Sequence, residues 1–123
     1  MGNRTKLRGI IVLGLLLFTS RASFAEIDTS SANLILPACR EWVNAVEGAP
    51  LRGDPVLRGL CMGTIDGIFY VDPRICPPSK GNKVSLGQIA RVVVRYIDNH
   101  PARMHEDFKR LALEAIRDAW PCQ

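Results

Sequence analysis

The feature that most constrains the fold is a set of four cysteines in a chain of only 123 residues. A chain this short buries a small hydrophobic core, so covalent cross-links matter more to its stability than they would in a larger domain. The cysteines are Cys39, Cys61, Cys76 and Cys122. An even number in a short exported chain predicts a disulfide framework. We expect two disulfides, each contributing about 3–4 kcal/mol by constraining the unfolded chain.

The N-terminus indicates that the chain is exported. Three basic residues precede a short uncharged apolar run, and a small-x-small tripeptide follows it, which is the organisation of a secretory signal peptide. These are Arg4, Lys6 and Arg8, residues 10–18, and Ser23-Phe24-Ala25. The run is shorter than the roughly 20 apolar residues that a bilayer-spanning helix needs. We predict a signal peptide over residues 1–25 and a periplasmic domain over residues 26–123, with no membrane segment after cleavage.

Cleavage would change the charge of the protein. The formal net charge of +4 is carried entirely by Arg4, Lys6, Arg8 and Arg21, because residues 1–25 contain no acidic side chain. The remaining domain is therefore neutral overall, and its charge gives no reason to expect a nucleic-acid partner. The sequence also has no C-x-x-C pair. His100 and His105 share no helical face with a cysteine, so disulfides are strongly favoured over a metal site.

The pattern of apolar residues predicts an all-α fold, a small four-helix domain stapled by two disulfides. The expected helices span residues 31–47, 54–71, 85–99 and 101–120. The third has the strongest pattern, since a capping box at Ser85 and Gln88 precedes apolar residues at positions 89, 92, 93, 96 and 97. The second begins with a good N-cap and a proline at its first position, Asp54-Pro55.

Two helices carry features that suggest further contacts. Gly59, Gly63 and Gly67 lie four residues apart, and each costs roughly 1 kcal/mol relative to alanine. We expect another helix to approach this stripe, which would place the second helix centrally. In the fourth helix, Leu113 and Trp120 lie nearly opposite the inner apolar stripe. Either other parts of the chain surround that helix, or this second face contacts a dimer mate or another partner.

No arrangement of residues predicts an active site, so we expect the protein not to be an enzyme. All four cysteines are better used in bridges, and neither histidine has an obvious catalytic partner. Asp66 is the one carboxylate in an apolar neighbourhood, and we expect it to be structural, either paired with an arginine such as Arg91 or Arg95 or bonded to a backbone amide. We predict no catalytic residues, no metal ion and no cofactor.

An ordered set of short motifs covers residues 39–122. A cysteine in the first helix is followed by Cys61-x-Gly63-x-Ile65-x-Gly67, Cys76-Pro77, a Val-rich stretch from Gln88 to Tyr96, His100-Pro101, and Ala115-Ile116 before Pro121-Cys122. This order resembles the Rap/Tai immunity proteins of bacterial type VI secretion. One departure is Thr64, where the family pattern leads us to expect an aromatic residue.

The resemblance implies a periplasmic, all-α, disulfide-bonded protein that often forms a homodimer. It also implies that the partner is a protein toxin, a peptidoglycan amidase, blocked by a protruding loop. In this sequence the connection between the third and fourth helices is very short, so the candidate loop is residues 72–84. It carries Arg74, Lys80, Asn82 and Lys83, which we expect to contact the toxin. The alternatives are that this loop is only a solvated connector, or that the protein is a periplasmic helical binding or chaperone-like protein.

Four cysteines allow three pairings, and the sequence alone does not select among them. We favour a bridge between Cys39 and Cys61, which would join the first two helices. The second bridge, between Cys76 and Cys122, would then tie the candidate loop to the C-terminus.

Overall fold

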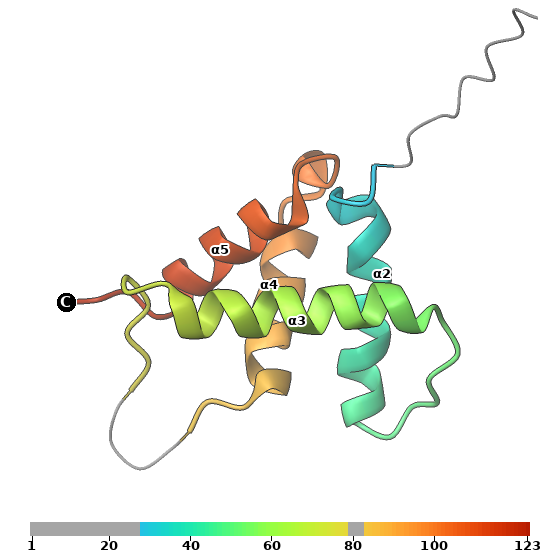
Figure 1. Cartoon of the computed structure of the whole chain (residues 1–123), viewed down its shortest axis with the longest axis horizontal. Helices are drawn as coiled ribbons and strands as arrows, with labels where there is room; N and C mark the ends of the chain where they lie inside the picture. The colour runs from blue at the N-terminus through green and yellow to red at the C-terminus, as the bar shows by residue number, and fades with distance from the viewer. Residues whose placement is uncertain (1–27, 79–82) are drawn as a thin grey trace, which may run out of the picture.

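The structure, a computed structural model, describes residues 28–78 and 83–123. It contains four α-helices and one short 3-10 helix, and no strand in these two ranges (Figure 1). The elements are α2 (Ala32–Val46), α3 (Pro55–Val71), α4 (Leu86–Asp98), η1 (Pro101–Arg103) and α5 (Phe108–Ala119). The predicted all-α class is therefore confirmed. The predicted signal peptide, residues 1–25, lies outside the described residues and stays a prediction.

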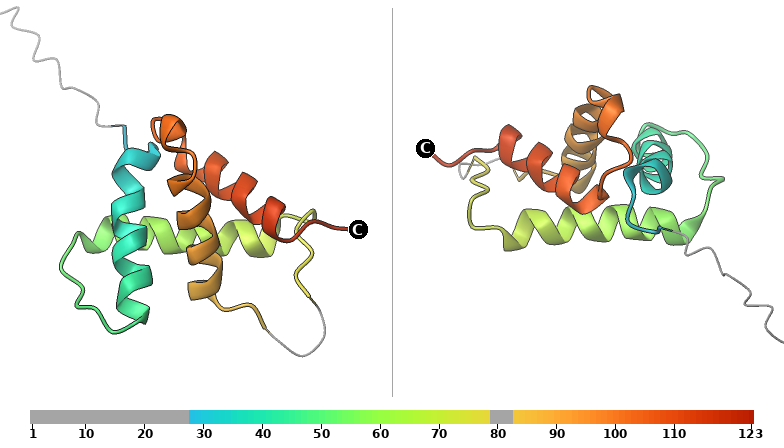
Figure 2. Two further views of the ribbon diagram at one scale, coloured as in Figure 1. Left: turned by 180° about the vertical axis from the view of Figure 1, so that it is seen from behind. Right: turned by 90° about the horizontal axis from the view of Figure 1, so that it is seen from above.

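The helices form two layers. In Figure 1, α3 runs across α2, α4 and α5, and the view from above in Figure 2 shows α3 by itself on one side of the other three. Each of α2, α4 and α5 packs against α3 and against the others. In this arrangement none of the described helices covers the side of α3 that points away from the second layer.

The core lies between these layers and is built mainly by α2, α4 and α5. Its largest fully buried side chains are Leu36, Ile65, Ile89, Ile97, Phe108, Leu111 and Ile116. From α3, only Cys61 and Ile65 are buried. The prediction that this helix is central is therefore wrong. A Cβ atom at Gly59, Gly63 or Gly67 would meet nothing within 4 Å, so no helix of the described residues makes the predicted approach to these glycines.

The predicted starts of the first three helices are confirmed by side-chain caps. Ser31 and Ser85 accept hydrogen bonds from the backbone N–H groups of Asn33 and Gln88, each over 3.2 Å. Asp54 accepts from Val56 N–H over 2.7 Å, and Pro55 is the first residue of α3. These oxygens satisfy N–H groups that have no partner within a helix, which stabilises each start by about 1 kcal/mol.

The prediction of one continuous helix from Pro101 to Trp120 is wrong. The chain forms η1, turns over residues 104–107, and starts α5 after Asp107, which caps that helix. The carbonyl groups of Met104 and Glu106 accept hydrogen bonds from Asn33 N–H (2.8 Å) and Ala32 N–H (2.9 Å). Because these carbonyls bind the first turn of α2, they are not available to continue a helix.

A cluster of ion pairs stabilises the turn between η1 and α5. The guanidinium of Arg103 lies 2.8 Å from the carboxylate of Glu106 and 2.7 Å from that of Glu114. Arg110 also pairs with Glu106. The hydrogen bonds from these two arginines lower the pKa of Glu106 from its usual 4.5 to about 2.

Both favoured disulfides are present in the structure. The Cys39–Cys61 bridge joins α2 to α3, and both residues are fully buried. The Cys76–Cys122 bridge joins the segment after α3 to the C-terminus. The two bridges connect different pairs of segments, so each restrains a different part of the fold.

Replacing Cys39 and Cys61 together by alanine should lower the free energy of unfolding by about 3 kcal/mol, because the bridge closes a loop of 22 residues. Urea unfolding of the oxidised protein, followed by circular dichroism, measures this change. The matched control is the Cys76→Ala/Cys122→Ala variant, in which α3 stays bonded to α2. An unchanged urea midpoint for the first variant would contradict the prediction.

Glu106→Gln should reduce stability at pH 7 but not at pH 2. A carboxylate whose pKa is lower in the folded protein stabilises the fold above its unfolded pKa, and this contribution is lost as the pH falls through the folded value. The difference between wild type and variant should therefore shrink between pH 4.5 and about 2. Thermal unfolding across this range tests it. Glu47→Gln, which breaks a single exposed pair with Arg91, is the control and should have little effect.

Candidate functional site

The candidate site is the α3–α4 loop, residues 72–85, which contains the residues predicted to contact a partner. The structure describes its two ends, residues 72–78 and 83–85. The first end leaves α3 beside the C-terminal tail of the chain, and the second leads into α4 (Figure 1). The described part of the site is therefore characterised by the bonds that fix each end of the loop and by the side chains that each end exposes.

The first end is fixed to the C-terminal tail by covalent and backbone bonds. Cys76 is bonded to Cys122, and its N–H donates to the carbonyl of Trp120 over 2.9 Å. Ile75 forms a backbone bridge with Pro121 and buries its side chain in the core. Trp120 packs edge-on against Phe69 of α3, with ring centroids 5.5 Å apart. These contacts hold residues 72–76 in one conformation.

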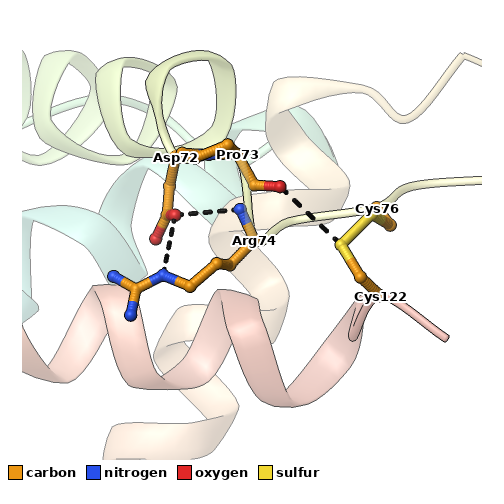
Figure 3. Close-up of a disulfide and its surroundings, with 5 residues drawn as sticks. All are labelled: Asp72, Pro73, Arg74, Cys76 and Cys122. Carbon is orange, nitrogen blue, oxygen red and sulfur yellow. Dashed lines mark hydrogen bonds and ion pairs between the residues drawn. A yellow bond between two sulfur atoms is a disulfide. The ribbon is translucent and has the colours of Figure 1, made fainter.

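Asp72 is the polar centre of this end, and its side chain is only 10% exposed. One carboxylate oxygen accepts from the backbone N–H (3.0 Å) and the Nε–H (3.3 Å) of Arg74, as Figure 3 shows. The other oxygen accepts from Nε–H of Arg117, on α5, over 2.6 Å. An acidic residue at the C-terminal end of a helix is unfavourable for the helix dipole, and these two guanidinium groups offset that cost.

Figure 3 also shows Pro73 beside the disulfide, with its carbonyl oxygen 3.8 Å from Sγ of Cys122. A sulfur atom in a disulfide carries no proton, so this is a packing contact rather than a hydrogen bond. It places the peptide between Pro73 and Arg74 directly against the bridge, which further restricts the backbone that carries Arg74.

Arg74 is exposed although it is paired. Its side chain is 69% exposed, and only its Nε bonds to Asp72. A guanidinium has five N–H donors in a planar fork. Its terminal amino groups therefore face solvent on a fixed backbone, with a geometry suited to a carboxylate or carbonyl group of a partner.

The other three predicted contact residues are distributed as follows. Lys83 is exposed at the second end of the loop, next to the half-buried Val84 that packs on the core. Lys80 and Asn82 lie outside the described residues. The structure thus places a basic side chain at each end of the loop. It does not bring Arg74 and Lys83 into contact with each other.

The sequence analysis missed the residues that hold the site. Asp72 and Arg117 are 45 positions apart, and no local pattern links an acid after one helix to an arginine in another. It also missed a shallow hollow of about 420 Å³ beside Asp72, lined by Gly67, Ile68, Val71, Asp72, Leu113 and Arg117. Leu113 lies in that hollow, whereas Trp120 packs within the chain.

The residues considered for catalysis are dispersed. Nδ1 of His100 lies 2.7 Å from the carbonyl oxygen of Tyr96, which ties the ring to the end of α4. His105 is exposed in the turn before α5. The predicted pairing of Asp66 with Arg91 or Arg95 is wrong, because Arg91 pairs with Glu47 (2.9 Å) and Asp66 makes no ion pair with any described residue, Arg95 included.

Two further findings concern residues 28–78 and 83–123. No three His, Cys, Asp or Glu side chains there are grouped so that they could hold a metal ion. None of the helices in these ranges has the length and apolar character needed to cross a membrane.

The family model of the Rap1a immunity proteins matches residues 31–122. The match covers all four α-helices, both disulfides and the whole α3–α4 loop. No curated protein and no solved structure gives a match.

Asp72→Asn should lower the free energy of unfolding by about 1–2 kcal/mol, since it weakens charge-assisted hydrogen bonds in a shielded position. The control is Asp98→Asn, which breaks an ion pair with Arg40 whose side chains are about 40% exposed and should cost less than about 1 kcal/mol. Urea unfolding of the two variants under identical conditions gives the comparison. Equal effects would show that Asp72 does not hold the loop in the manner described.

Proposed function

The chain belongs to the Rap1a immunity proteins, and from this premise we propose that it protects its own cell by binding and inhibiting a secreted peptidoglycan amidase. The observation that carries this proposal is the family match, which extends over residues 31–122. Family membership supports a protein toxin as the partner. The amidase chemistry of that toxin is part of the proposal.

We further propose that inhibition takes place in the periplasm. Structural disulfides form and persist in oxidising compartments, and this domain has two of them. The predicted signal peptide would deliver the chain there. A toxin that cleaves the cell wall acts in the same compartment, so the inhibitor would meet it before damage occurs. We also propose that the protein is a homodimer, as the family resemblance implies.

The α3–α4 loop is the proposed contact with the toxin. Its first end is held by a disulfide, a backbone bridge and the Asp72 carboxylate. A loop end that is already fixed loses less conformational entropy on binding than a free one. Arg74 and Lys83 expose basic groups at its ends, and Lys80 and Asn82 lie between them in the sequence. Basic groups arranged in this way suit an acidic or carbonyl-rich surface around an active site.

An inhibitor of this kind forms a stoichiometric complex and has no turnover. The second candidate is a periplasmic binding or chaperone-like protein with many clients, which the exposed apolar side chains of α3 favour. The two differ in the number of partners and in affinity. A chaperone would bind many unfolded proteins weakly, whereas an immunity protein would bind one folded toxin tightly.

The experiment that tests the proposed function uses the purified protein and any toxin encoded beside its gene. A single saturable one-to-one complex, in which peptidoglycan hydrolysis stops, is the expected result. Co-expression should also rescue cells into whose periplasm the toxin is directed. Retention of many weak clients, with no effect on any wall hydrolase, would discard the immunity function in favour of the second candidate.

Replacing Arg74, Lys80 and Lys83 together by alanine should weaken toxin binding by about 2 kcal/mol or more, roughly 30-fold, because three charged contacts are removed. Isothermal calorimetry with the identified toxin measures the change. The control removes two exposed basic side chains elsewhere, Arg95→Ala and Lys109→Ala, and should leave affinity unchanged. Equal affinity of the loop variant and wild type would show that the loop is a solvated connector.

A further inference from the structure

We propose that the Cys76–Cys122 disulfide is a site of thiol–disulfide exchange, which a protein dithiol opens by attack on Cys76 while the Cys39–Cys61 disulfide stays closed. Opening this bridge releases the first end of the α3–α4 loop and leaves the helices folded. The exchange itself does not depend on the proposed function. Its effect on toxin binding rests on that function and is tested separately.

The two disulfides differ in their exposure to solvent. Cys39 and Cys61 are 0% exposed and lie within the hydrophobic core. Cys76 and Cys122 are both exposed, and Figure 3 shows them on the coil segments that follow α3 and α5. An attacking thiolate must reach a sulfur atom in line with the S–S bond, so the buried bridge reacts only when the core opens. The fold therefore contains one protected bridge and one accessible bridge.

The surface beside the accessible bridge favours attack on Cys76. A hollow of about 490 Å³ lies between the loop end and the C-terminal tail, and Cys76 lines it, whereas Cys122 does not. Sγ of Cys122 instead packs against the carbonyl oxygen of Pro73, 3.8 Å away. An incoming thiolate therefore has an open approach to the first of these two sulfur atoms.

The lining of this hollow suits a protein better than a small thiol. It contains Pro77, Pro78, Ala119 and Trp120 and no charged side chain. Such a surface offers no ion pair to the carboxylates of glutathione. A protein that carries its reactive cysteine on an apolar surface would instead remove these side chains from water on docking, which is favourable. The hollow therefore points to a protein dithiol as the reductant.

The exchange proceeds in two steps. The attacking thiolate bonds to Sγ of Cys76, and the original S–S bond breaks with its electron pair on Sγ of Cys122. The second thiol of the reductant then loses its proton and attacks the mixed disulfide, which releases Cys76 as a thiolate. The reductant is oxidised to a disulfide, and two electrons and two protons pass to the two cysteines.

The carbonyl group of Pro73 is placed to stabilise the reduced form. Once Cys122 has taken up a proton, its S–H group can donate to this oxygen at the separation already present, 3.8 Å, which is within reach of a weak sulfur donor. The packing contact of the oxidised protein thus becomes a hydrogen bond without movement of the tail.

Most of the attachment of the loop end does not depend on the disulfide. Ile75 is buried in the core and forms its backbone bridge with Pro121. The Asp72 carboxylate accepts from Arg117 of α5. These contacts involve no sulfur atom, so residues 72–75 should keep their positions when the bridge opens.

Residues 76–78 are the part that the disulfide holds. Pro77 and Pro78 have no backbone N–H group and donate no hydrogen bond. The bond from Cys76 N–H to the carbonyl of Trp120, 2.9 Å, is the last backbone hydrogen bond at this end among the described residues. Reduction leaves this single bond to fix the segment, so the loop gains conformational freedom from Cys76 onwards.

Timed reduction of the oxidised full-length protein, exported with its own N-terminal segment, tests the selectivity. With dithiothreitol, alkylation and peptide mapping should find Cys76 and Cys122 reduced at least about 100-fold faster than Cys39 and Cys61, and circular dichroism should be unchanged at that stage. The control, Cys76→Ser/Cys122→Ser, retains only the buried bridge and should release no thiol in the same time. Release of all four thiols together would overturn the proposal.

The route and the reductant are tested with thioredoxin, as a protein dithiol, and with glutathione. Thioredoxin whose second active-site cysteine is replaced by serine should stop at a mixed disulfide on Cys76. Ala119 is exposed, so Ala119→Gln can fill the hollow; it should slow thioredoxin at least about 10-fold and leave glutathione unaffected. A mixed disulfide on Cys122, or faster reaction of the wild type with glutathione than with thioredoxin, would contradict the proposed route.

Two measurements on the reduced and alkylated protein separate the exchange from the proposed function. Hydrogen exchange at Cys76 N–H should accelerate at least about 10-fold, and an unchanged rate would show that the bridge does not hold the loop. Affinity for the toxin should fall about 10-fold, because a freer loop loses more entropy on binding. Faster hydrogen exchange with unchanged affinity would reject the loop as the toxin contact while the exchange site stands.

Discussion

The Cys39–Cys61 bridge is the bond on which the position of α3 depends. This helix buries only Cys61 and Ile65 fully, so its hydrophobic attachment to the second layer is thin for its 17 residues. The bridge lies in the core and holds α3 against α2. Because this disulfide holds α3 in place, the outward side of the helix can remain unpacked without α3 detaching from the fold. A helix held mainly by packing would have to bury more of its own surface.

The second disulfide fixes the position at which the α3–α4 loop begins. Cys76–Cys122, the Ile75–Pro121 backbone bridge and the Asp72–Arg117 pair act on the same few residues. Together they join the end of α3 to the end of α5, so the loop starts from a rigid point. Loop residues beyond that point can vary in sequence without disturbing the core.

Local signals predicted much of this fold, and contacts between distant residues account for what was missed. Helix starts at Asp54 and Ser85 depend on bonds within one turn, so their sequence patterns were sufficient. The break before α5 was missed because it depends on carbonyls at 104 and 106 binding the start of α2, some 70 residues earlier. At the candidate site, Arg74 was selected for its charge and stays a prediction, whereas Asp72 was missed because its partner Arg117 is remote in sequence.

The misplacement of α3 is the instructive error, because the glycine pattern predicted a neighbouring helix that the described residues do not supply. Three glycines in line within an apolar helix do indicate close approach of another helix. No helix among residues 28–78 and 83–123 approaches them, and these residues leave the glycines open between Val56 and Tyr70. A sequence pattern records all the contacts that a protein makes, including those with other molecules. When a strong packing signal is unsatisfied inside the fold, the physical cost of the glycines and of the exposed apolar side chains remains, and a neighbour from outside the chain is the simplest way to offset it.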